Sequence, residues 1–314
     1  MSNMGKIDHG TSCISCHTTL PYALASWAAK SKLPNSQLSP TQIELLRSIT
    51  TRIKLGQLGQ PYLSGPLQSK GTESVTNALI LATYRKSQFV APKVLQLAFQ
   101  VLWQRQIKTG ANTGSWNWFS LGNEPWEAPD SQYWGAALAA IAVGRMPRAY
   151  KTSPNIQTGR YLLKSYLLQN LPSQSLHNQL TLLWASHYWK TLLNRVQKSA
   201  IISKTLAIQR KDGGWRSGDL ISPSWHRYDG TQQHNGSDGY ATGLVTYILK
   251  IAGDSRTKFA CSKGTRWLEK NQNPITGAWV AYSLNKKRDL SSDVGKFMSD
   301  AATAFAVLAL THQH

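Results

Sequence analysis

The most constraining feature of this chain is a motif that recurs where predicted helices end. In each copy a glutamine closes the helix, glycine makes a turn, and a tryptophan follows: Gln106 to Trp116, Gln209 to Trp215 and Gln272 to Trp279. A glutamine at a helix end can bond exposed backbone or stack its amide on the indole. Trp116 and Trp215 are 99 residues apart, which fits two repeats of about 50 residues. We therefore expect an array of helical hairpins whose outer ends are tied together by this motif.

Apolar residues recur at the spacing of one helix face in eleven stretches. These run over 21–32, 39–53, 71–86, 92–108, 131–144, 153–170, 174–192, 194–209, 239–252, 256–271 and 300–311. The alternation of Val, Ile and Thr that would indicate strands is nearly absent. Hydrophobic residues make up 41% of the chain and charged residues 16%, which is typical of a folded protein. No apolar run reaches the roughly 20 residues of a membrane span. The sequence predicts an all-α protein and argues against transmembrane and fibrous classes.

Two longer patterns carry a family resemblance. Residues 209–215 have the pattern Gln-x-x-Asp-Gly-Gly-Trp, and residues 263–279 have Lys-Gly-x-x-Trp-Leu followed by Gln and Gly-x-Trp. Both patterns resemble the QW repeats of squalene–hopene cyclases and of the related terpenoid cyclase and prenyltransferase toroids. Similar stretches lie at 133–139, 237–244 and 299–306, so that the resemblance covers roughly residues 70–312.

The resemblance implies an α/α toroid, a barrel of six helical hairpins with a cavity lined by aromatic and small apolar side chains. It also implies a hydrophobic, isoprenoid-like ligand. Two departures limit what it implies about the reaction. The chain lacks the Asp-x-Asp-Asp motif with which class II triterpene cyclases protonate their substrate. Cys261 has no matching context for the zinc site of a protein prenyltransferase. Neither reaction is therefore expected.

The predicted helices divide the chain into an N-terminal segment, residues 1–20, and a toroid over residues 21–314. Eleven helices are one short of six hairpins, so we expect one helix and an export signal to precede residue 1. In such a toroid, the loops that lead from an outer helix into the next inner helix share one face with the N-terminal segment. Those loops are 55–70, 109–130, 171–173, 212–238 and 272–300. A binding site is expected among them.

The sequence Cys13-Ile14-Ser15-Cys16-His17 is the strongest chemical signal. Its spacing lets two thiols reach the vinyl-derived carbons of haem while the adjacent imidazole binds the iron from one side. In this hypothesis Cys13 and Cys16 anchor a covalent haem c, and His17 is an axial ligand. The alternatives are a redox-active thiol pair, half of a zinc site, or chance. This motif joined to a toroid resembles uncharacterised bacterial cyclase-like proteins that carry a haem c motif.

Met298, in Gly-Lys-Phe-Met-Ser-Asp, is the candidate second axial ligand. It lies in the last predicted loop, which closure of the toroid brings beside the first helix. His226 and His234 are the next candidates. The alternative for Met298 is a methionine that fills the core.

Three aspartates, Asp130, Asp238 and Asp300, share a position at the start of a predicted inner helix. The structural interpretation is N-capping, in which the carboxylate accepts from the first free N–H groups. The functional interpretation is a catalytic acid or base at the rim of the cavity. Glu124 and Glu127, beside Trp126, could form a carboxylate pair over an aromatic wall, with a solvated loop as the alternative.

The formal net charge of +20 bears on partners and location. No helix-turn-helix, zinc-finger or aromatic-basic strand pattern accompanies it, so a nucleic-acid partner is not expected. An anionic membrane surface or an acidic redox partner fits better. Haem c is normally attached outside the cytoplasm, which predicts a periplasmic or peripheral membrane protein. The segment ahead of Cys13 shows no export signal, and without haem the expected location is the cytoplasm.

Together these features predict a redox protein in which a haem c at the cavity mouth serves a hydrophobic, isoprenoid-like ligand. If it is an enzyme, it would be an oxidoreductase or a terpene cyclase-like isomerase. The alternatives are a cofactor-free terpene cyclase or isomerase that uses the three aspartates, and a non-catalytic lipid-binding toroid.

Overall fold

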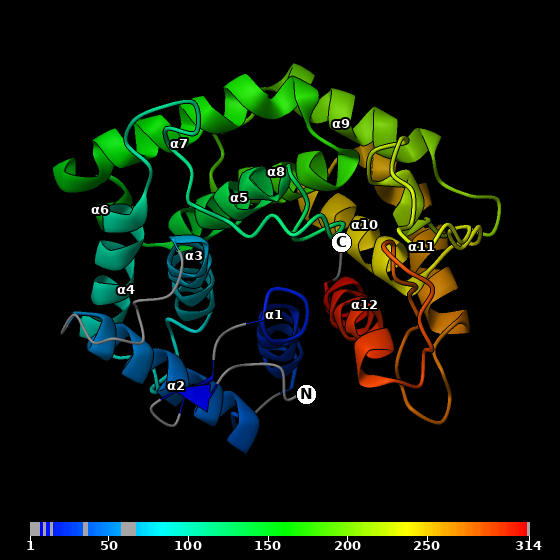
Figure 1. Ribbon diagram of the computed structural model, residues 1–314, viewed down its shortest axis with the longest axis horizontal. Helices are drawn as coiled ribbons and strands as arrows, with labels where there is room; N and C mark the ends of the chain where they lie inside the picture. Colours follow the sequence, from blue (N-terminus) through cyan, green and yellow to red (C-terminus); the bar gives the residue numbers. More distant parts are fainter. Residues whose placement is uncertain (1–6, 9–10, 13–14, 34–36, 58–66, 313–314) are drawn as a thin grey trace.

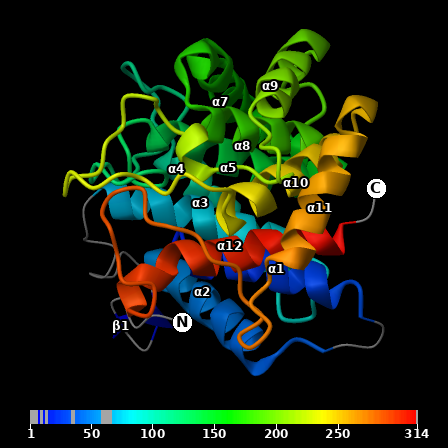
Figure 2. The same cartoon turned by 90° about the vertical axis from the view of Figure 1, so that its right-hand side faces the viewer.

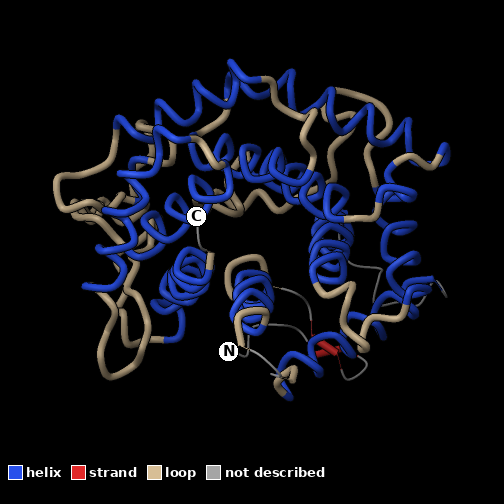
Figure 3. Tube along the Cα trace, turned by 180° about the vertical axis from the view of Figure 1, so that it is seen from behind, coloured by secondary structure: helices blue, strands red, loops and turns tan. Residues whose placement is uncertain are grey.

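The computed structural model describes residues 7–8, 11–12, 15–33, 37–57 and 67–312, and this part of the chain is mostly helical. Its α-helices are α1 (Thr19–Lys30), α2 (Pro40–Gln57), α3 (Leu67–Thr83), α4 (Pro92–Arg105), α5 (Ser131–Arg145), α6 (Arg148–Lys151), α7 (Gln157–Asn170), α8 (Leu176–Tyr188), α9 (Arg195–Ala207), α10 (Gly239–Ala252), α11 (Lys258–Lys270) and α12 (Asp293–Thr311). The two-residue strands β1 (Ile7–Asp8) and β2 (Thr11–Ser12) pair antiparallel beside α2 (Figure 3). The predicted all-α class is confirmed, and each of the eleven predicted helices is present.

Six long helices form an inner layer: α1, α3, α5, α8, α10 and α12 (Figure 1). Each contacts the next in this order and α12 contacts α1, so that the contacts close a circuit. The remaining long helices, α2, α4, α7, α9 and α11, lie outside them. Inner and outer helices therefore alternate along the chain.

The inner helices α5, α10 and α12 consist largely of small and apolar residues, whereas α3 and α8 also bury polar side chains such as Glu73 and His177. In α5 the whole run from Tyr133 to Gly144 is buried. The outer helix α11, by contrast, buries only four of its 13 residues. The close approach of α10 and α12 depends on Gly243, where an added Cβ would lie 2.7 Å from the backbone nitrogen of Ala306. Burial pattern and helix position thus follow from composition.

The Gln–Gly–Trp motif ties outer helices together, as the sequence predicts. Gln106 Nε2 donates to Gly114 O in its own turn (3.0 Å) and to Gly159 O in α7 (2.9 Å). Gln209 Nε2 bonds its own turn in the same way and reaches Ala260 O in α11 (2.9 Å). Each indole bonds back to the preceding helix: Trp116 Nε1 to Leu102 O (2.7 Å), Trp215 Nε1 to Thr205 O (3.0 Å) and Trp279 Nε1 to Leu268 O (2.7 Å). The role of these motifs is structural.

The long loops that lead into the inner helices lie on one face and bind one another. We call residues 109–130, 208–238 and 271–292 the loop face. Asn285 and Glu124 exchange two hydrogen bonds of 2.9 Å, between the amide of Asn285 and the backbone of Glu124. Tyr228 N donates to Asn285 O (2.9 Å). Figure 2 shows the second and third of these loops on the side of β1 and the start of α12, with the end of α12 on the opposite side.

The start of the last inner helix differs from the prediction. α12 begins at Asp293, seven residues before the predicted start at 300, because Ser292 caps it through a bond from Gly295 N (3.0 Å). Met298 and Asp300 therefore lie inside a helix, and the expectations that Met298 is in a loop and that Asp300 begins the helix are wrong. The one-turn helix α6 was not predicted, because four residues are too few to show a periodic pattern.

Among the described helices, α12 alone is long and apolar enough to cross a membrane by length and composition. Half of its apolar window is buried inside the molecule, where α12 packs against α1 and α10. The core helix of a water-soluble protein has these same properties.

Candidate functional site

His17 lies just ahead of α1 and beside two segments that are distant in the sequence. Its ring centroid is 4.5 Å from that of Phe297 in α12 and 5.6 Å from that of Trp126 on the loop face. Its Nδ1 and the hydroxyl of Ser15 form a hydrogen bond of 3.1 Å. The segment ahead of α1 and the first half of α12 therefore lie side by side.

Burial controls the charge of His17. Removal from water lowers the pKa of its imidazole to about 4, so that the ring is neutral at physiological pH. A neutral imidazole is the form that binds a metal. Because Ser15 engages Nδ1, Nε2 is the nitrogen that a metal-ligating role would use, with Ser15 as the partner that orients the ring.

The described residues near His17 fit a haem c in the chemistry of their donors. Cys16 directly precedes the neutral imidazole, and Met298 follows Phe297 in α12. Cys16 and Met298 are 6% and 5% exposed. Cys13, the other predicted anchor, lies outside the described residues.

A buried polar network continues inward from His17. Trp126 packs against Tyr240 with a centroid distance of 5.3 Å, and its Nε1 donates to the Tyr240 hydroxyl (3.1 Å). The same hydroxyl is 2.8 Å from His177 Nε2, in α8. All three side chains are buried, and burial lowers the pKa of His177 to about 4, so that it too is neutral. A chain of ring contacts and hydrogen bonds thus leads from His17 to the loop-face ends of α8 and α10.

Phe297, Tyr240 and His177 were not predicted as site residues. Phe297 is the neighbour of Met298, and Tyr240 belongs to one of the stretches that resemble the toroid family. His177 stands near the start of an inner helix with no motif around it. Only the fold brings these side chains together.

Glu124 and Asp130 are two carboxylates of the loop face whose charges affect each other. Burial, and then the charge of Asp130, raise the pKa of Glu124 to about 7. Asp130 precedes α5 without capping it, and its carboxylate accepts from Asn178 Nδ2 (3.0 Å). Burial also raises the pKa of Glu127. Glu124 can therefore hold a proton close to neutral pH, as a general acid requires.

The other predicted aspartates have different surroundings. Asp238 is buried and caps α10 through a bond from Ala241 N (3.0 Å), and it also accepts from the backbone (2.6 Å) and hydroxyl (2.7 Å) of Ser217. These are the contacts of a structural cap. Asp300 is exposed in α12. The three aspartates thus have no common partner among these contacts.

His226 and His234, the next candidates after Met298 for the second iron ligand, lie in the loop that precedes α10. His226 Nδ1 donates to Ser224 O (2.7 Å), and the His234 ring stacks on Tyr282 at 3.9 Å. A cavity of about 730 Å³ in this loop is lined by His226 and Arg227, among others. Arg227 also donates to Ser283 O (2.6 Å), and this bond joins the second and third loops of the loop face.

No group of three or more His, Cys, Asp and Glu side chains in the described part of the chain is arranged to hold a metal ion. The described residues therefore offer no cluster that would complete a zinc site with the cysteine motif.

Comparison with known proteins adds no assignment. None of the protein-family models matches this chain, and the search of curated proteins found no match. The interpretation of the site consequently depends on its own residues.

Proposed function

We propose that this chain is an α/α toroid of the terpenoid-cyclase type that carries a covalent haem c and acts as a redox protein for a hydrophobic, isoprenoid-like ligand. The observation that supports the proposal best is the set of contacts around the His17 ring. The ring follows Cys16 directly, is neutral through burial, has Nδ1 engaged by Ser15, and packs against Phe297 of the last inner helix. The closed circuit of inner-helix contacts supports the toroid.

The roles of the residues follow from their chemistry. Cys13 and Cys16 would anchor the porphyrin, and His17 would bind the iron through Nε2. Met298 would be the second residue to bind the iron. When bound, the haem supplies one-electron transfer. Ser15 orients the His17 ring, and the packing of Phe297 and Trp126 keeps water from it.

The partner classes follow from the apolar interior and the net charge. Small apolar and aromatic side chains of the inner helices suit a hydrophobic small molecule. A charge of +20 suits an acidic redox partner or an anionic membrane surface. Because haem c is attached outside the cytoplasm, the proposed location is the periplasm or the membrane periphery.

The test is a spectrum of the exported chain. The protein is produced behind a signal peptide in a host that matures c-type cytochromes, and its absorption is recorded oxidised and reduced. We expect His17→Ala to keep the haem attached but to shift the Soret band, with added imidazole restoring the original spectrum. His226→Ala, on the exposed loop, is the matched control and should leave the spectrum unchanged. Equal spectra for wild type and His17→Ala would contradict the proposal.

A further inference from the structure

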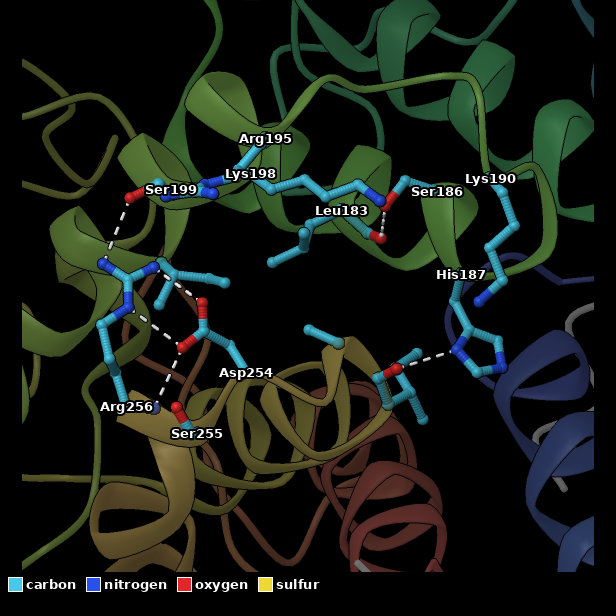
Figure 4. A pocket seen from close by; sticks show the side chains of 13 residues that line it. Leu183, Ser186, His187, Lys190, Arg195, Lys198, Ser199, Asp254, Ser255 and Arg256 are labelled. Carbon is cyan, nitrogen blue, oxygen red and sulfur yellow. Dashed lines mark hydrogen bonds and ion pairs between the residues drawn. The ribbon is translucent and has the colours of Figure 1, made fainter.

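A second cavity lies at the opposite end of the inner helices. α8 and α10 begin on the loop face and end at Tyr188 and Ala252. A cavity of about 640 Å³ opens there between these two ends and the start of α9 (Figure 4). The 14 residues of α10, at 1.5 Å per residue, place it about 20 Å from the loop face. It is thus separate from the site around His17.

The wall of this cavity is positively charged. Its lining includes Lys190, Arg195, Lys198 and Arg256, and Asp254 is the one acidic side chain among the lining residues. Asp254 is paired with Arg256 (Oδ2 to Nη2, 2.7 Å). Arg256 also donates to the Ser199 hydroxyl (3.1 Å), which holds its guanidinium against the wall. The other three cations have no acidic counterpart among the lining residues.

His187 also lines the cavity and lies close to its positive charges. Its Nδ1 donates to Ile251 O (2.8 Å) at the end of α10. Burial lowers the pKa of His187, the bond to Ile251 O raises it, and the charges of Lys190, Arg145 and Lys198 lower it further. An anion placed here would relieve this repulsion.

The floor of the cavity is apolar. Leu183 of α8, Ile202 of α9 and Ile251 of α10 line it, and each is at most 6% exposed over its whole side chain and backbone. Cationic groups above an apolar floor present two kinds of surface to one ligand. A simple inorganic anion would use only the first.

We propose that this cavity binds an amphiphile with a phosphate head group. The phosphate lies among Lys190, Arg195 and Lys198, and the start of the apolar chain lies on the floor. A guanidinium presents a planar fork that matches phosphate oxygens, and lysines add mobile point charges. The volume is within the range of small-molecule pockets, roughly 300–1,000 Å³. This inference goes beyond the redox proposal and does not depend on haem.

The test is calorimetric titration of the full-length protein with three probes: inorganic diphosphate, soluble dihexanoyl phosphatidic acid, and vesicles that contain phosphatidic acid. The pocket variant is Lys190→Gln with Lys198→Gln. The matched control is Lys211→Gln with Lys270→Gln, which removes two exposed lysines that do not line the cavity. We expect the soluble lipid to bind at least about tenfold more tightly than diphosphate, and the pocket variant, but not the control, to lose about tenfold in affinity. Ring resonances of His187 should shift on binding.

Each other outcome overturns a stated part of the inference. Equal affinity for diphosphate and the soluble lipid would show that the apolar floor is not used. Equal losses in the pocket variant and the control would show attraction by net charge alone. Binding to vesicles without binding of the soluble lipid would show a membrane-surface contact instead of a pocket.

Discussion

His17 illustrates how a single side chain acquires its properties from segments far away in the sequence. The motif around it predicts a haem ligand from spacing alone, but its neutrality is due to burial against Phe297 and Trp126. The expected closure of the toroid placed the last inner helix near it, yet could not show which side chains of that helix face the ring. The partners of His17 therefore had to come from the structure.

Glu124 is the residue whose predicted pH dependence is most direct. Its pKa is raised to about 7 in the folded protein from 4.5, the ordinary value. The folded state therefore keeps the proton over a range in which the unfolded state loses it, and stability falls as pH rises from about 4.5 to 7. Glu124→Gln removes this slope, because its amide resembles the protonated acid.

We expect Glu124→Gln to match the wild type at pH 4.5 and to be more stable by about 2 kcal/mol at pH 8, after allowance for solvent screening. Urea unfolding at both pH values measures this difference. Glu269→Gln, at an exposed position of α11, is the control for the removal of one carboxylate. A constant difference between Glu124→Gln and wild type across this range would contradict a pKa of Glu124 that folding raises.

At the scale of elements, the sequence predicted most of the helices because their apolar patterns are long. It placed the start of α12 seven residues late, because the capping serine Ser292 and the polar turn before it carry no apolar signal. The same limit applied to Asp130, which stands where a cap would stand but bonds Asn178 instead. Helix existence follows from periodicity, whereas the bonds at a helix end depend on neighbouring elements.

The glutamines of the recurring motif give a prediction at this scale. Gln106 is 3% exposed and satisfies two carbonyls, of which one belongs to the next outer helix, whereas Gln272 is exposed and bonds Gly277 O in its own turn. Gln106→Ala leaves two backbone acceptors without their donor and should lower the free energy of unfolding by about 2–3 kcal/mol. Gln272→Ala should cost less than about 1 kcal/mol. Denaturant titration of both variants measures these losses, and similar costs would show that the tie between outer helices contributes no stability.

On the scale of the whole molecule, two features occupy opposite ends of one set of inner helices. His17 and the buried carboxylate of Glu124 lie at the loop face, and the cationic cavity lies where α8 and α10 end. The sequence predicted convergence of the long loops, because alternation of inner and outer helices fixes which links share a face. It did not predict the cationic cavity, because its lysines and arginines come from three separate links and helices.

The measurement that tests the central claim most directly is a pyridine haemochrome spectrum of the exported protein. The account predicts an α-band of c-type position in the wild type and in Cys261→Ala, and its loss in the double variant Cys13→Ala, Cys16→Ala. Cys261 is the remaining cysteine of the chain and serves as the matched control. A colourless wild-type protein, or a double variant that retains covalent haem, would contradict the account.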